Sequence, residues 1–134
     1  RGRELIQAGY CDRLALIGAT QAELRNARVH VRHVLVWDDL LQRNSWGEAE
    51  AARDRMRAIG YKSAMVVSDP PHMLRLLYTW GSVFRGTDLR YTLVATNPAW
   101  WPRWKWWSNA SAAAFVRSEV LKLGYYVLNY RFGF

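Results

Sequence analysis

The sequence predicts an α/β fold, a three-layer α/β/α sandwich around a mainly parallel, Rossmann-like sheet. Four short apolar runs near residues 14, 34, 64 and 92 have the length of strands, and segments with helical periodicity separate them. The first three runs contain almost no polar residues, which is typical of strands covered on both faces. Strands that alternate with helices pair in parallel through right-handed crossovers. Because 134 residues suit a single core, we expect one domain over residues 1–134.

The first half of the chain contains recognisable helix and strand boundaries. A glycine that follows a periodic apolar segment ends a helix, and a short apolar run stopped by a glycine is typical of a strand. Ser45 with Glu48 three residues later has the pattern of a capping box, which begins a helix. We expect a helix over 3–9 closed by Gly9, a strand over 14–17, a short helix over 20–26, a strand over 34–37, and a helix from Ser45 through Gly60 with the apolar stripe Ala49, Ala52, Met56 and Ile59.

The second half continues the alternation and ends in the longest predicted helix. Its apolar positions recur at helical spacing, so one stripe of that helix should face the sheet. We expect a strand over 64–67, a helix that follows the two prolines and runs to about Trp80, a strand over 91–95, and a helix from about Asn109 to Tyr130 with the stripe Ala112, Phe115, Val116, Val120, Leu123 and Val127.

The segment from Ser68 to Arg75 is the most informative one for function. It lies where a buried strand turns into a helix, which is where open α/β sheets bind ligands. Proline is favoured in a first helical turn, so Ser68 or Asp69 should cap this helix. Free backbone donors of that turn, together with Arg75, would form a pocket for phosphate or carboxylate.

His72 falls in the first turn of the same helix. A helix N-terminus disfavours a protonated imidazole, so a neutral His72 could serve as a hydrogen-bond donor or as a general base, which makes it the catalytic candidate. The alternative interpretation is that Asp69 only caps the helix while His72 and Arg75 are solvated. A second candidate site is the turn with Ser45 and Glu48, which also follows a strand; its alternative is an ordinary capping box.

Composition limits the classes of partner. Nineteen Lys and Arg residues against eleven Asp and Glu residues give a net charge of +8, which favours an anionic partner or surface. The basic residues are dispersed and form no known nucleic-acid module, so nucleic acid is the least favoured partner. No apolar run reaches eighteen residues. The single Cys11 has no partner for an internal disulfide and no metal-ligand spacing around it.

A tryptophan-rich segment occupies residues 100–107, from Trp100 to Trp107, and holds five of the eight tryptophans. Tryptophan interleaved with Arg and Lys favours a membrane–water interface, although packing under the last helix is the more common use of such rings. Stacking on nucleic-acid bases is a third interpretation. The membrane-interface interpretation leads to an alternative function for the protein. In that alternative, it is a non-catalytic interaction module at the envelope or membrane surface.

Together these motifs resemble the bacterial YdcF/SanA/ElyC family. Its strand followed by Thr-Ser-x-x-His-Met-x-Arg is matched by Ser68, His72, Met73 and Arg75, with Val67 where threonine is usual. The family's Asn-Thr-x-Glu-Asn-Ala turn is similar to residues 44–49, with Gly47 in place of the acidic residue. Its Ser-Gly-Gly loop is reduced here to residues 17–20, which include Gly18. Trp106, Trp107 and residues 119–126 are similar to a C-terminal helix of many Gram-positive members.

The resemblance implies a small anionic or nucleotide-like ligand and a role in bacterial envelope biogenesis, in an envelope-associated or cytoplasmic protein, with no established reaction. S-adenosylmethionine has been linked to the family as a ligand. By this resemblance Ser68, Asp69, His72 and Arg75 would hold the ligand, with Ser45, Glu48 and Gly18 nearby. The family domain opens with a strand and a glycine-rich loop that have no counterpart before Arg1. We therefore expect an upstream segment, or a second chain, to complete the sheet.

Overall fold

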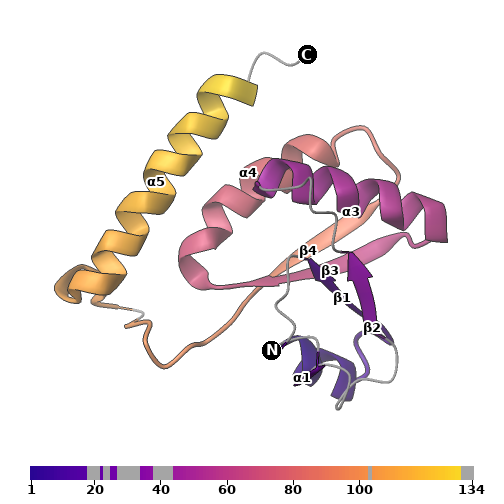
Figure 1. Cartoon of the computed structure of the whole chain (residues 1–134), viewed down its shortest axis with the longest axis horizontal. Coiled ribbons are helices and arrows are strands. Elements are labelled where there is room, and N and C mark those ends of the chain that lie inside the picture. Colours follow the sequence, from indigo (N-terminus) through magenta and orange to yellow (C-terminus); the bar gives the residue numbers. More distant parts are fainter. Residues whose placement is uncertain (18–21, 23–24, 27–33, 38–43, 103, 131–134) are drawn as a thin grey trace. The chain divides into compact units, whose positions relative to one another are not determined.

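A computed structural model describes residues 1–17, 22, 25–26, 34–37, 44–102 and 104–130. The chain divides into two compact units, Arg1–Ile59 and Gly60–Phe134, which are described separately (Figure 1). Each unit combines helices with one pair of parallel strands. The mixed α/β class is therefore confirmed.

The first unit begins with helix α1 (Gly2–Gln7), and Gly9 follows it with a positive φ of 78°. Strands β1 (Leu14–Ile17) and β2 (Val34–Trp37) pair in parallel. Both strands have the predicted bounds. Gly18 lies outside the described residues. Of the predicted helix over 20–26, only residues 22, 25 and 26 are described.

Helix α3 (Ser45–Ile59) completes the first unit. Its cap is Asn44, whose side-chain oxygen accepts a hydrogen bond from the backbone N–H of Gly47 at 2.9 Å. The predicted cap at Ser45 is wrong by one residue, because Ser45 is already the first helical residue and is buried. The predicted stripe is buried at Ala49, Ala52 and Met56, whereas Ile59 is exposed at the end of the helix.

The second unit contains the other strand pair. Strands β3 (Ser63–Ser68) and β4 (Arg90–Ala95) are parallel, with Ser63 opposite Arg90. A 3₁₀ turn, η1 (Pro70–His72), leads into helix α4 (Met73–Val83). Helix α4 packs on β4. Its buried face meets the strand in an aromatic cluster of Trp80, Phe84 and Tyr91.

A second 3₁₀ turn, η2 (Trp106–Ser108), precedes the long helix α5 (Ala110–Tyr130). Asn109 caps α5, since its side-chain oxygen accepts the backbone N–H of Ala112 at 2.9 Å. Helix α5 packs mainly against α4, as Figure 1 shows, and not against the strands as predicted. The predicted stripe fails at Val120, which is exposed. The buried positions of α5 are Ala112, Glu119 and Tyr126.

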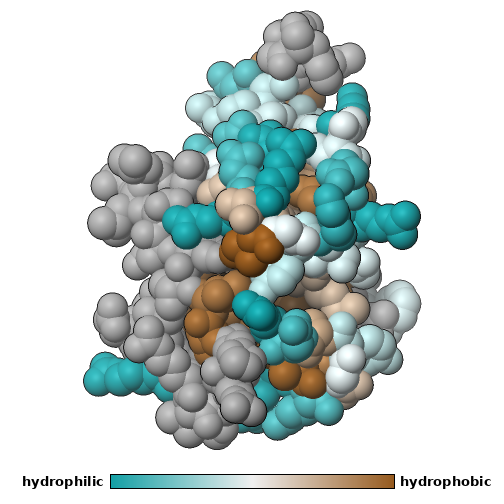
Figure 2. Space-filling view, turned by 90° about the vertical axis from the view of Figure 1, so that its right-hand side faces the viewer, coloured by the Kyte–Doolittle hydropathy of each residue, from teal (hydrophilic) through white to brown (hydrophobic). Residues whose placement is uncertain are grey.

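The four described strands form two sheets of two strands each. Parallel pairing is confirmed within each sheet. The strands are partly exposed, in contrast to the prediction that their faces are fully covered. Among the described strands, both members of each pair are therefore edge strands. In Figure 2, apolar side chains reach the surface in small patches between hydrophilic ones.

Within the described parts of the chain, no helix is both long enough and apolar enough to cross a bilayer.

Candidate functional site

The carboxyl ends of β3 and β4 are joined by Thr96, the residue that follows β4. Its backbone N–H donates to the carbonyl oxygen of Ser68 at 2.9 Å. Its hydroxyl donates to the carboxylate of Asp69. Asp69 stands at the N-cap position of η1, but its side chain makes no capping bond. The predicted cap is therefore wrong, because Thr96 engages the Asp69 carboxylate and Ser68 still belongs to the strand.

The backbone donors of the following turn are also engaged. The N–H of His72 donates to the carbonyl of Asp69 at 3.0 Å, and the N–H of Met73 donates to the carbonyl of Pro70. The two prolines stand in the first turn, as predicted, but the turn is a 3₁₀ helix whose bonds reach back only three residues. The backbone amides of His72 and Met73 are therefore hydrogen-bonded within the turn. The predicted pocket of free amides near residues 71–73 is wrong.

Arg75 is buried on the inner face of α4 and is paired with a carboxylate. Its Nε donates to Oε2 of Glu119, on α5, at 2.6 Å. Its guanidinium also lies 6.0 Å from the centre of the Tyr126 ring, a cation–π contact. The alternative of a solvated Arg75 is therefore wrong. The sequence predicted that Arg75 pairs with an anionic ligand. In the structure its charge is paired with Glu119.

Glu119 is the centre of the cluster, with a side chain only 5% exposed. Its Oε1 accepts a hydrogen bond from Nζ of Lys122 at 2.8 Å, and its Oε2 lies 3.2 Å from Nδ1 of His72. Burial alone would raise the pKa of Glu119, but hydrogen bonds from Arg75 and Lys122 and the nearby positive charges outweigh burial, so its pKa is lowered. We call His72, Arg75, Glu119 and Lys122 the Glu119 cluster.

Nδ1 of His72 is close to both Arg75 and Glu119. Nη2 of Arg75 lies 2.8 Å from Nδ1 of His72. Oε2 of Glu119 lies 3.2 Å from the same nitrogen. Arginine only donates and a carboxylate only accepts, so Nδ1 accepts from Arg75 when its proton is absent and donates to Glu119 when it is present. The ring is also held edge-on against Phe115 at 4.9 Å. These contacts fit both the hydrogen-bond donor role and the general-base role of His72.

The cluster has more positive than negative charge. Arg75 and Lys122 contribute +2 and Glu119 contributes −1, which leaves +1 when His72 is neutral. The charge is not fully enclosed, because the side chains of His72 and Lys122 are 27% and 50% exposed. The partly exposed members of the cluster are therefore an imidazole and an ammonium group, which can donate hydrogen bonds to an anion.

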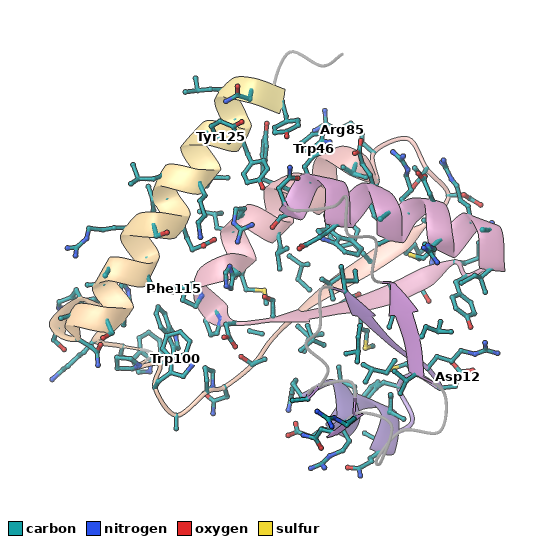
Figure 3. All side chains as sticks on the ribbon, in the orientation of Figure 1. Asp12, Trp46, Arg85, Trp100, Phe115 and Tyr125 are labelled. Atoms are coloured by element: carbon teal, nitrogen blue, oxygen red, sulfur yellow. The ribbon has the colours of Figure 1, made fainter. Side chains whose placement is uncertain are left out.

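The tryptophan-rich segment is partly packed and partly exposed. Trp100 lies edge-on to Phe115 with ring centres 5.8 Å apart, and Figure 3 shows the two side chains together where this segment passes the start of α5. Trp106 and Trp107 also contact each other. However, Trp104 is 79% exposed, and Trp100 and Trp107 are exposed as well. Core packing alone does not account for these rings.

Ser45 and Glu48 belong to the first unit. Ser45 is buried at the start of α3, and the backbone N–H of Glu48 donates to the carbonyl of Asn44 at 3.0 Å. Gly18 lies outside the described residues. Among the described residues, no three His, Cys, Asp or Glu side chains gather as metal ligands.

Sequence reasoning missed three residues of this region: Thr96, Glu119 and Lys122. Glu119 had a detectable signal, because it lies seven residues after Ala112 and seven before Tyr126, within the inward stripe of α5. A charged residue on such a stripe usually has a buried partner. Thr96 also had a detectable signal, because it directly follows a predicted strand. That strand is parallel to the strand that ends at Ser68, so the residues after the two strands lie at the same end of the sheet.

The lowered pKa of Glu119 predicts acid sensitivity. A carboxyl whose pKa is depressed by folding stabilises the protein above its unfolded pKa, and this contribution is lost as the pH falls through the folded pKa. We expect the free energy of unfolding to decrease below about pH 4.5, the ordinary value of the group. Urea unfolding between pH 3 and 7 would measure it. The Glu119→Gln variant should lose less unfolding free energy than wild type as the pH falls. If the unfolding free energies of the two proteins changed with pH in parallel, the lowered pKa would not belong to Glu119.

The resemblance described above stays a prediction. No protein-family model matches this chain, and neither a curated protein nor a solved structure shows significant similarity to it.

Proposed function

We propose that the second unit binds a small anionic or nucleotide-like ligand beside the carboxyl ends of β3 and β4. The observation that carries the proposal is the surplus positive charge of the Glu119 cluster at an edge where His72 and Lys122 are accessible. Ligand sites of parallel α/β sheets lie at this end of the strands. An anion placed there would gain charge-assisted hydrogen bonds, which are stronger than neutral ones.

Each residue has a separate role in this proposal. His72 donates its Nε2–H to the ligand and remains the candidate for any proton transfer. Lys122 supplies a second donor and the positive charge. Arg75 is a positioning residue, because it contacts Nδ1 of His72 and neutralises Glu119. Ser68 and Asp69 form the strand end behind the site, where Thr96 holds the Asp69 carboxylate.

The wider proposal is a YdcF-like domain of the bacterial envelope. The parallel pairing of both strand pairs supports one three-layer sandwich as the complete fold. The same resemblance also assigns Ser45, Glu48 and Gly18 to ligand binding. S-adenosylmethionine is the candidate cofactor that the family resemblance adds.

Titration with inorganic phosphate tests the site. The imidazole signals of His72, observed by NMR, should shift on addition of phosphate. His72→Phe and Lys122→Gln should each weaken phosphate binding by roughly tenfold or more, because each removes one charge-assisted hydrogen bond. Lys62→Gln is the matched control, since Lys62 is an exposed lysine paired only at the surface with Asp88. Equal phosphate binding by all four proteins would reject the site.

A further inference from the structure

Helix α5 is apolar on two opposite faces. Its inner face, with Ala112, Glu119 and Tyr126, is buried. Its outer face presents Val120, Leu121, Tyr125 and Leu128, and the two leucines are 75% and 73% exposed. Leu121 and Leu128 are two turns apart on one side of the helix. A helix with apolar side chains on both faces normally has both faces covered, so the exposed apolar side chains of the outer face suggest a partner.

The residues just before α5 extend this apolar surface. The 3₁₀ turn η2 packs against α5, and Trp107 within it is exposed. Trp104 precedes this turn and is more exposed still. Tryptophan rings are the side chains most enriched at the headgroup level of bilayers, where one edge is apolar and the other is wet.

The charge around this surface identifies the kind of partner. Between residues 104 and 130 the exposed charges are Lys105, Arg117 and Lys122, all positive. The only acidic residue in this range, Glu119, is buried and neutralised by its partners. A second copy of the chain would therefore bring like charges together, whereas an anionic surface would meet complementary charge. Arg117 can extend its head group past the apolar side chains toward phosphate.

We propose that the outer face of α5, together with Trp104 and Trp107, docks on the surface of an anionic lipid bilayer. The helix would lie in the plane of the interface, with its leucines at the boundary of the acyl chains and its cations among the phosphates. The docking surface consists of Trp104, Lys105, Trp107, Arg117, Val120, Leu121, Tyr125 and Leu128. It shares no residue with the proposed ligand site, and the two proposals can fail independently.

Vesicle binding tests this surface with the whole chain. We expect co-sedimentation and a blue shift of tryptophan emission with vesicles of equal parts phosphatidylglycerol and phosphatidylcholine, and much weaker binding to phosphatidylcholine alone. Leu121→Ser with Leu128→Ser should lower the partition coefficient by about tenfold or more, because two apolar side chains no longer enter the interface. Lys105→Gln and Arg117→Gln should each lower it by about fivefold, an effect that salt should reduce.

Leu74→Ser with Leu77→Ser is the matched control, since these leucines are exposed on α4. It should bind vesicles as wild type does, and so should His72→Phe, which tests the ligand site alone. Circular dichroism would confirm that helix content is unchanged in every variant. Equal binding to both vesicle types, or to wild type and the Leu121/Leu128 variant, would overturn the proposal. So would lipid-free self-association that the Leu121/Leu128 variant abolishes, because the face would then bind a second copy.

Discussion

Glu119→Ala is expected to lower the free energy of unfolding by about 3–5 kcal/mol, a typical effect of removing one partner of a buried ion pair. The reason is that Arg75 would remain buried without the carboxylate that accepts its Nε at 2.6 Å. The surplus positive charge around His72 and Lys122 would also increase. Urea unfolding of wild type and variant at pH 7 measures the difference.

Two further variants separate the loss of the pair from the loss of packing. Arg75→Leu combined with Glu119→Leu should recover most of the stability, since a hydrophobic pair of similar volume often replaces a buried ion pair without loss. Lys62→Ala breaks an exposed ion pair with Asp88 and should change stability by less than about 1 kcal/mol. A loss from Glu119→Ala no larger than that of Lys62→Ala would show that the pair is not buried in solution.

Trp80→Ala is expected to have a comparably large effect, a loss of about 3–5 kcal/mol. Trp80 is buried at the centre of the aromatic cluster, stacked on Phe84 at 4.9 Å between ring centres and 5.8 Å from Tyr91. Alanine would remove these contacts and leave a cavity between α4 and β4. Thermal or urea unfolding would report the loss.

Trp104→Ala is the control for the Trp80 variant, because the same substitution there removes an exposed ring. It should change stability by no more than about 0.5 kcal/mol. Similar losses from both substitutions would mean that the aromatic cluster around Trp80 is not the core of this unit.

The two proposals place different functions on opposite faces of one helix. The inner face of α5 supplies Glu119 and Lys122 to the cluster, and its outer face supplies Leu121 and Leu128 to the docking surface. The Arg75–Glu119 pair joins α5 to α4, next to the turn that carries His72. Substitutions at Glu119 should therefore disturb both functions, whereas substitutions at His72 or Leu121 should disturb only one.

Much of the secondary structure could be predicted from the sequence because its determinants are local. Strands β1 and β2 match their predicted bounds, since short apolar runs between polar or glycine residues have few other uses. Helix α5 begins at Ala110, within one residue of the predicted start, and its cap Asn109 acts on an amide only three residues away. The prediction that Pro70 and Pro71 lie in a first turn is confirmed. Its determinant is also local, because proline lacks the N–H that a first turn leaves unbonded.

The partners of the charged side chains were decided only by the tertiary structure. Arg75 meets Glu119 across 44 residues, and Asp69 meets Thr96 across 27. Neither spacing has a local signature, because helix packing brings the first pair together and strand pairing the second. Sequence reasoning therefore treated Arg75 as free to hold a ligand and Asp69 as free to cap a helix. A buried charge pairs with a complementary group because leaving it unpaired in a low dielectric costs several kcal/mol. That cost is comparable to the net free energy of unfolding of a whole domain.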